Sequence, residues 1–447
     1  MTSRIAVSVG VFFLGLQAQS GPVAFVDVTV VPMNRDTVLT HQTVLIQDRR
    51  ISALGPSKKI RIPKSVQAIN GGGRFLIPGL ADMHAHLNAR GPDGILKNED
   101  YATLYLANGV TTVRNMWGDP AALAFKRSVE AGSAWGPQVF TSGPLTDGNP
   151  PTRPGSRVVE TAAQATQAVE DDKRAGYDAI KVYDALKPDV YEALMATAAK
   201  LGLPVWGHVP ELVLVERALE LGQRSIEHVG GYLNALDRDT SPGKAAQLVA
   251  MTVKAGTWNC PTLVFYQGAL PSDEIEKAVA LRESSSLMPP ALLRIWSNNP
   301  QLRSLTAYQF SRIRLYDQKR EAFVTALHKG GAKLLLGTDE PNTLVAPGFA
   351  IHQELANLVH VGMTPFEALR AGTSDAALFL NRGNDFGTVA VGRRADLILL
   401  DANPLENVTN VGRRVGVMAR GKWMPESELK ARLERLRKSY PKAPAIR

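Results

Sequence analysis

The sequence predicts an α/β protein in which a (β/α)₈ TIM barrel is flanked by a small β-sandwich domain built from both ends of the chain. Two features predict this fold. Between residues 77 and 386, short apolar runs alternate with helical patterns, which is typical of parallel strands joined by crossover helices. On either side, runs rich in Val, Ile and Thr alternate with turn-like clusters, which is typical of antiparallel strands. The 447 residues are enough for a large barrel and a smaller unit.

The first 20 residues are similar to a secretory signal peptide. Arg4 supplies a positive charge, residues 5–16 form an apolar run, and Ala18 and Ser20 are small residues spaced like a cleavage site. The run is too short to span a membrane comfortably, and the alternative is a buried first strand or helix. Cleavage near Ser20 would leave an exported protein, in the periplasm or in the extracellular medium.

The remaining composition indicates a globular protein with a solvated basic surface. The formal net charge is +9, but Lys and Arg are interspersed with Asp and Glu, and no basic run contains interleaved aromatic residues. We therefore expect no nucleic-acid partner and no membrane span. Cys260 is the only cysteine, which excludes an intrachain disulfide, and its apolar surroundings predict an inert buried position. Self-association into a homo-oligomer is left open.

The two terminal segments, residues 21–76 and 387–425, are expected to pair into the composite β-sandwich domain. Residues 77–386 are assigned to the barrel, with strands expected at 77–83, 110–115, 138–142, 179–183, 204–209, 225–229, 258–264 and 333–338. Residues 268–320 exceed a minimal connection and are expected to add helices over the barrel mouth. Residues 426–447 form a C-terminal tail whose alternating charges predict a solvated helix.

Candidate metal ligands fall at the ends of the expected strands. His84 and His86 are separated by one residue, so in a strand they point to the same side and can hold one metal ion. The later strands carry four further candidates, which are Lys181, His208, His228 and Asp339. The active sites of (β/α)₈ barrels lie at the C-terminal ends of the strands, and core packing would instead scatter the histidines. The pattern therefore favours a metal site.

In this order on successive strands, the six residues resemble the metal ligands of the amidohydrolase superfamily, and the flanking β domain is also typical of it. Shorter segments resemble the branch that contains imidazolonepropionase-related proteins, metal-dependent Xaa-Pro dipeptidases and carboxypeptidase-like amidases. These segments are residues 111–114, 225–228, 337–339 and 365–373.

The resemblance implies two divalent metal ions, most commonly Zn²⁺, bridged by a carboxylated Lys181. A protonated amine cannot ligate a cation, whereas a carbamate offers two oxygens and a negative charge. The ligands assigned to one ion are His84, His86 and Asp339, those assigned to the other are His208 and His228, and Lys181 is shared. The alternative is an unmodified Lys181 paired with a carboxylate beside a single metal ion, as in the imidazolonepropionase and deaminase branches.

The same resemblance implies attack of a metal-bound hydroxide on an amide carbonyl, with Asp339 accepting the proton and returning it to the leaving nitrogen. Tyr183 lies on the same strand face as Lys181 and either contacts the substrate carbonyl or packs in the barrel. Arg114 is a candidate for binding a substrate carboxylate or for a structural ion pair. His352 is a further substrate-binding candidate, with a helix surface as the alternative. The polar loop at residues 143–153 is expected to form a pocket rim.

The sequence therefore predicts an enzyme, a metal-dependent hydrolase that cleaves the amide bond of a dipeptide or an N-acyl amino acid. A lactonase, phosphotriesterase or cyclic-amide hydrolase on the same binuclear site is the alternative, and each would act on a small molecule or short peptide. A binding protein that lacks the chemistry is disfavoured, because all six expected ligands are present.

Overall fold

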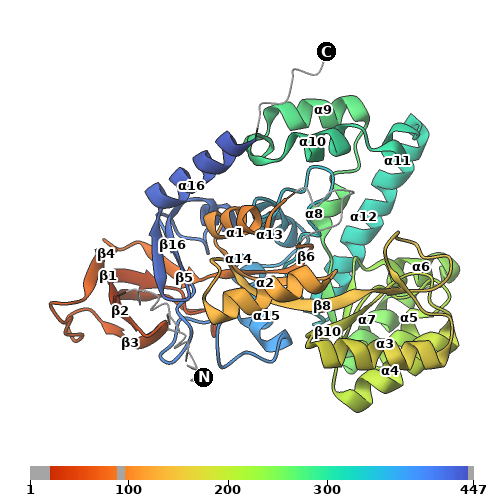
Figure 1. Ribbon diagram of the computed structural model, residues 1–447, viewed down its shortest axis with the longest axis horizontal. Coiled ribbons are helices and arrows are strands. Elements are labelled where there is room, and N and C mark those ends of the chain that lie inside the picture. The colour runs from red at the N-terminus through yellow and green to blue at the C-terminus, as the bar shows by residue number, and fades with distance from the viewer. Residues whose placement is uncertain (1–20, 88–95, 441–447) are drawn as a thin grey trace, which may run out of the picture.

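The computed structural model describes residues 21–87 and 96–440, so the expected signal peptide at residues 1–20 lies outside the described part of the chain. The described residues form two sheets. Figure 1 shows that strands from the two ends of the chain, coloured red and blue, lie side by side in one sheet next to the barrel. The prediction of a β domain built from both termini is confirmed.

The terminal sheet follows the order β17-β16-β15-β5-β1-β2-β3, with β4 also paired to β1. Its strands are β1 (Val23–Val30), β2 (Leu39–Gln47), β3 (Arg50–Pro56), β4 (Gln67–Asn70), β5 (Phe75–Pro78), β15 (Leu397–Leu400), β16 (Arg414–Ala419) and β17 (Lys422–Pro425). Three strands separate β1 from β17, yet the rings of Phe25 and Trp423 lie 5.0 Å apart. Since neighbouring strands are about 4.8 Å apart, the sheet must curl over its own core. The domain is thus one continuous sheet with a sandwich-like interior.

The barrel sheet is parallel and follows the order β14-β13-β12-β11-β10-β8-β7-β6. Its strands are β6 (Leu80–Ala85), β7 (Val110–Asn115), β8 (Gln138–Asp147), β10 (Ala179–Val182), β11 (Val205–Gly207), β12 (Ser225–Glu227), β13 (Trp258–Cys260) and β14 (Lys333–Leu334), and β9 (Arg157–Val158) pairs with β8. The chain after β14 continues along β6, because Met83 N donates to Leu336 O at 2.8 Å and Asp339 N donates to His84 O at 2.7 Å. These bonds join the two edges of the sheet.

The junction between the domains lies at Gly79, two residues later than expected. The expected barrel strand at residues 77–83 is in fact two strands: β5 belongs to the terminal sheet, where Ile77 pairs with Ile398, and β6 begins the barrel. A Cβ atom at Gly79 would lie only 2.2 Å from Thr111 Oγ1, so the chain passes between the two sheets at a position without room for a side chain. The expected strand at residues 258–264 is also shorter, because it ends at Cys260.

Helices surround the barrel, and a long insertion between β13 and β14 adds several more. The helices that alternate with strands are α1 (Asn98–Ala107), α2 (Pro120–Ala131), α3 (Ala162–Ala175), α4 (Pro188–Leu201), α5 (Val215–Glu220), α6 (Gly230–Arg238), α7 (Lys244–Ala255), α13 (Ala350–His360), α14 (Pro365–Ala371) and α15 (Ser374–Phe379). The long insertion supplies α8 (Leu263–Tyr266), α9 (Ser272–Leu281), η1 (Glu283–Leu287), α10 (Pro290–Ser297), α11 (Pro300–Arg303) and α12 (Ala307–Lys329). The C-terminal part contains η2 (Val408–Gly412) and α16 (Glu426–Ser439), the helix expected in the tail.

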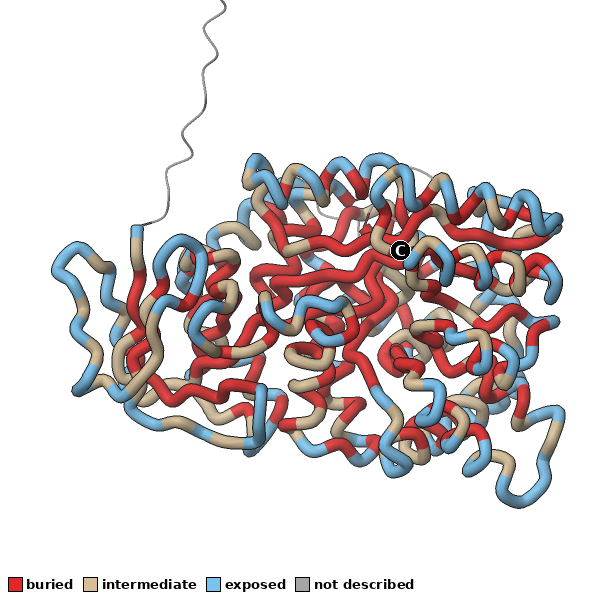
Figure 2. The backbone as a smooth tube through the Cα atoms, turned by 90° about the horizontal axis from the view of Figure 1, so that it is seen from below, coloured by how far each residue is buried: buried red, intermediate tan, exposed pale blue. Residues whose placement is uncertain are grey.

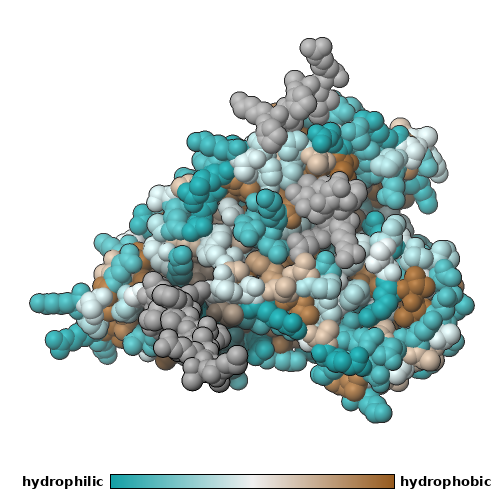
Figure 3. Space-filling model, viewed as in Figure 1, coloured by the Kyte–Doolittle hydropathy of each residue, from teal (hydrophilic) through white to brown (hydrophobic). Residues whose placement is uncertain are grey.

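Burial and surface character agree with a globular protein. Figure 2 shows buried residues concentrated along the central strands and exposed residues on the outer helices and loops. The described part of the face in Figure 3 is mostly hydrophilic, with hydrophobic side chains in separate patches. Among the described residues, no helix has both the length and the apolar character needed to cross a bilayer.

Candidate metal centre

The six predicted ligands come from strands that run in the same direction, so their ends meet at one edge of the barrel. His84 lies in β6, Lys181 in β10, and His86, His208, His228 and Asp339 follow β6, β11, β12 and β14. The ring of His84 lies 4.7 Å from that of His228 and 5.2 Å from that of His86. The ring of His208 lies 4.9 Å from that of His228. The structure therefore brings together side chains far apart in the sequence.

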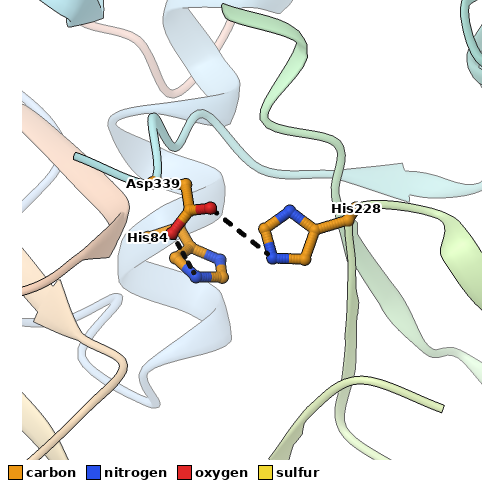
Figure 4. Close-up of side chains that lie close together, drawn as sticks. All are labelled: His84, His228 and Asp339. Atoms are coloured by element: carbon orange, nitrogen blue, oxygen red, sulfur yellow. Dashed lines mark ion pairs between the residues drawn. The ribbon is translucent and has the colours of Figure 1, made fainter. Parts of the chain in front are cut away.

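Asp339 lies between the imidazoles, as Figure 4 shows for His84 and His228. Its Oδ1 atom is 2.7 Å from His86 Nε2 and 3.3 Å from His84 Nε2, and its Oδ2 atom is 3.9 Å from His228 Nε2. Burial would raise the pKa of Asp339, but the charges of His84 and His228 and hydrogen bonds from His84 and His86 hold it well below its usual range. The carboxylate is therefore ionised and surrounded by nitrogen ligands.

In three of these imidazole rings, the Nδ1 atom lies within hydrogen-bond distance of an oxygen atom. The Nδ1 atoms of His84, His208 and His228 lie 2.9, 2.7 and 2.7 Å from Glu227 Oε2, Asp184 Oδ1 and Thr262 Oγ1, respectively. A carboxylate can only accept, so the Nδ1 atoms of His84 and His208 donate in these hydrogen bonds. Thr262 Oγ1 already donates to Pro261 O and can accept from His228 in the same way. Such outer partners orient metal-binding histidines in other proteins.

Burial favours the neutral form of His86, His208 and His228. Burial lowers the pKa of His86 and His208, and it lowers that of His228 well below the usual range, despite the nearby carboxylate of Asp339. Neutral imidazole offers a lone pair to a cation, whereas imidazolium does not. The donor set therefore suits divalent transition metals, which accept imidazole and carboxylate ligands.

Two of the ligands have an unusual backbone conformation. His228 and Asp339 have φ values of 63° and 61°, in the left-handed region that non-glycine residues rarely adopt. Such positions cost on the order of 1–3 kcal/mol each and cluster at functional sites. With these backbone conformations, the side chains of His228 and Asp339 approach each other to 3.9 Å.

Lys181 is the predicted ligand whose surroundings are unusual for a lysine. It is only 1% exposed, and its Nζ atom has no hydrogen-bond partner among the described residues. Burial lowers its pKa to about 8, although Glu227 and Asp339 oppose this shift. The alternative of a lysine paired with a carboxylate is not seen in the described part of the chain. A buried amine without a partner fits a site that is completed by a group bound there.

Tyr183 lies at the same centre. Its ring is 4.1 Å from that of His208, and its hydroxyl accepts a hydrogen bond from Arg153 Nε at 3.2 Å. Burial raises the pKa of Tyr183 to about 12, so the hydroxyl keeps its proton at neutral pH and can donate. Tyr183 thus packs against a ligand and also presents a polar group.

Arg114 does not have the surroundings expected of a substrate-binding residue, and this expectation is corrected. The side chain is fully buried, and its Nη2 atom lies 2.9 and 3.0 Å from the two carboxylate oxygens of Glu227. Nη1 donates to Ser225 Oγ at 2.9 Å, and Nε donates to Met83 O. The guanidinium is fully engaged within the barrel. Of the two interpretations of the sequence, the structural ion pair is the one observed.

His352 also lies elsewhere than expected. Its Nε2 atom is 2.9 Å from Arg414 Nη1 and 3.2 Å from Asn108 Oδ1, on the side of α13 that faces α1 and β16. These partners come from the packing between the barrel and the terminal sheet, and no described contact joins His352 to a metal ligand. The expected role in substrate binding is therefore not supported.

A second group of potential ligands has a simpler explanation. His84, Glu227 and Cys260 are close enough to hold an ion. However, Glu227 is already engaged by Arg114, whose charge, together with the hydrogen bond from His84, holds the pKa of Glu227 well below its usual range against the effect of burial. Burial raises the pKa of the Cys260 thiol well above its usual value. His84, Glu227 and Cys260 are therefore not assigned to a second metal centre.

Sequence reasoning missed the residues that support the ligands. Glu227 and Asp184 stand next to His228 and Tyr183 in the sequence, so acidic residues beside the candidate site residues were a usable signal. Thr262 gave no such signal, because its role depends on a left-handed backbone with φ of 50° after β13.

Comparisons with known proteins agree with this geometry. A sequence model of the amidohydrolase family matches residues 75–424. The chain belongs to the amidohydrolase family. It is 27% identical over 425 residues to an imidazolonepropionase from Arthrobacter sp. (strain FB24), covering 85% of this chain and 92% of that protein. It is 25% identical over 343 residues to adenine deaminase 2 from Agrobacterium fabrum (strain C58 / ATCC 33970), covering 75% of this chain but 47% of that protein. The chain thus spans about half the length of the adenine deaminases that it matches.

Solved structures with a similar fold were also found. A bottromycin amidohydrolase superposes with a TM-score of 0.74 and 25% identity, covering 94% of this chain and 92% of that chain. A putative prolidase from Bifidobacterium longum superposes with a TM-score of 0.71 and 24% identity, covering 93% and 98%. The latter similarity establishes the fold alone.

Proposed function

We propose that this amidohydrolase cleaves the amide bond of a dipeptide or an N-acyl amino acid at a binuclear metal centre. The observation that carries the proposal is the buried Lys181 amine, which has no partner among the described residues and interacts electrostatically with Asp339, His208 and His228. Carboxylation would replace this cation with a carbamate, a bridging ligand for two ions. With a pKa of about 8, part of the amine is in the neutral form needed for that reaction near neutral pH.

The residues present fit two divalent ions, for which Zn²⁺ is our choice. His84, His86 and Asp339 would hold one ion, His208 and His228 the other, and carboxylated Lys181 both. When bound, such ions activate a water molecule and polarise the scissile carbonyl.

Asp339 and Tyr183 would perform the remaining steps. The ionised Asp339 carboxylate accepts a proton from the attacking water and later delivers it to the leaving nitrogen. The protonated Tyr183 hydroxyl donates a hydrogen bond to the carbonyl oxygen as negative charge develops there. The contacts of both groups support these roles, since Asp339 lies 2.7 Å from His86 Nε2 and the Tyr183 ring packs against His208.

Cyclic-amide hydrolysis is the second candidate. It is favoured by the match to an imidazolonepropionase over 92% of that protein's length. The same ligands would then act around a single ion with Lys181 unmodified.

Amine release from a panel of dipeptides and N-acyl amino acids tests the proposal, with zinc-loaded and chelator-stripped protein assayed in parallel. We expect release that depends on metal. A panel without turnover, from protein that retains tightly bound metal, would contradict the proposal. Ring opening of cyclic amides by the same preparation would then identify the second candidate.

A further inference from the structure

We infer that Arg153 binds the carboxylate of the substrate, which restricts this enzyme to substrates with a free carboxylate on the leaving amine. The inference rests on the proposed amide hydrolysis and identifies its substrate class. The sequence suggested carboxylate binding for Arg114, but Arg114 is fully buried, and we assign this role to Arg153 instead.

The loop that carries Arg153 is anchored from within the barrel. Asp147, at the end of β8, is fully buried. Its Oδ2 atom accepts from Thr152 N at 2.7 Å, and its Oδ1 atom accepts from Gly148 N at 2.9 Å and from Ala185 N at 2.7 Å. One carboxylate therefore ties the residue before Arg153 to the chain just after Tyr183. This arrangement fixes the position of Arg153 relative to the metal centre.

The side chain of Arg153 points toward that centre. Its Nε atom donates to Tyr183 Oη at 3.2 Å, and the Tyr183 ring lies 4.1 Å from the ring of His208. The guanidinium is therefore separated from a proposed metal ligand by one aromatic ring. Arg153 is exposed, so a substrate that enters from solvent can reach it.

The end of the guanidinium is available for a ligand. Among the described residues, Tyr183 is the one side-chain partner of Arg153, and it engages Nε and leaves Nη1 and Nη2 free. By contrast, Arg157 in the same segment donates to both oxygens of Asp172, at 2.9 and 2.8 Å, and to Thr146 Oγ1 at 2.8 Å. Two parallel N–H groups of an arginine match the two oxygens of a carboxylate.

The distances suit a dipeptide or an N-acyl amino acid. In such a substrate the carboxylate lies one residue beyond the scissile carbonyl, or about 3.5 Å along an extended chain. If Tyr183 donates to the carbonyl, a carboxylate one residue further reaches the arginine that is bonded to the same tyrosine. A peptide with a blocked C-terminus would offer Arg153 no negative charge.

The test compares a dipeptide with its C-terminal amide in the zinc-loaded enzyme, using the variants Arg153→Gln and Arg153→Lys. We expect Arg153→Gln to lower kcat/KM for the dipeptide about 10- to 100-fold, mainly through KM, because a charge-assisted hydrogen bond is lost. The amide should be a poor substrate of the wild type and should change less than about twofold. Arg153→Lys should retain part of the dipeptide activity, since lysine keeps the positive charge but lacks the two parallel N–H groups of arginine.

Arg174→Gln is the matched control, because Arg174 is an arginine on α3 whose partner is Asp171. Both substrates should be unaffected by it. Equal losses on the dipeptide and the amide in Arg153→Gln would overturn the inference, since they would mean that Arg153 only positions Tyr183. In that case the proposed function stands, because the wild type still hydrolyses amides. A wild type that cleaves neither substrate would overturn the proposed function and this inference together.

Discussion

Asp184 Oδ1 lies 2.7 Å from His208 Nδ1, and the residue before it, Tyr183, packs its ring against the same imidazole at a tilt of 32°. Two consecutive residues after β10 therefore contact His208, the predicted ligand that follows β11. The hydrogen bond sets which nitrogen faces the centre, and the ring contact sets the plane of the imidazole.

This arrangement predicts that Asp184→Ala weakens metal binding. Loss of the partner leaves His208 free to rotate, and outer-shell changes of this kind reduce metal affinity about 10- to 100-fold. Metal content after dialysis against graded chelator concentrations measures the effect. Asp189→Asn is the control, because Asp189 is an exposed residue in the first turn of α4. Equal retention of metal by Asp184→Ala and the control would contradict the assigned role.

Asp339→Asn should abolish most turnover while leaving the fold intact. The amide keeps a similar shape but cannot accept the proton, and general acid–base catalysis contributes about 10²- to 10⁴-fold. Steady-state kinetics on the best amide substrate, corrected for metal content, measures the loss. A variant with bound metal and wild-type kcat would rule out Asp339 as the proton carrier.

Reactivation of metal-stripped protein should require carbon dioxide as well as zinc, and should quicken as pH rises through 8. The neutral amine of Lys181 is the reactive form, and its pKa is lowered to about 8 by burial. About a tenth of the amine is neutral at pH 7 and about nine-tenths at pH 9. Recovery rates should be measured at a fixed concentration of dissolved carbon dioxide, because this gas itself converts to bicarbonate as pH rises. Recovery that is indifferent to carbon dioxide would indicate an unmodified lysine.

Arg114→Met should destabilise the fold without changing substrate preference. It leaves the buried Glu227 carboxylate without its cation, which typically costs about 3–5 kcal/mol. Urea unfolding of the metal-free protein measures the loss in the free energy of unfolding. The ratio of activities on a dipeptide and its amide should stay at the wild-type value, in contrast to Arg153→Gln. A selective loss on the dipeptide would return Arg114 to substrate binding.

Much of the architecture could be predicted because it depends on local periodicity. The strand at residues 110–115 is observed with the expected bounds, as β7. The helix expected near residues 426–438 is α16. The break at Gly79 was visible as Pro78-Gly79, but the sheet to which Ile77 belongs depends on its pairing with Ile398, more than 300 residues away. No local pattern carries that information.

The sequence alone determined which residues could ligate a metal. These residues stand at the ends of expected strands, and parallel strands end at the same edge of a barrel. They are His84, His86, Lys181, His208, His228 and Asp339. Only the tertiary structure decided between the two interpretations of Arg114, since an arginine at a strand end has the same appearance whether it faces solvent or a buried carboxylate. The Arg114–Glu227 ion pair and the approach of Arg153 to Tyr183 both join segments with no shared periodicity. Which side chains meet across a barrel depends on where each one points and on how deeply it lies inside the barrel. The spacing of residues along the chain specifies neither of these.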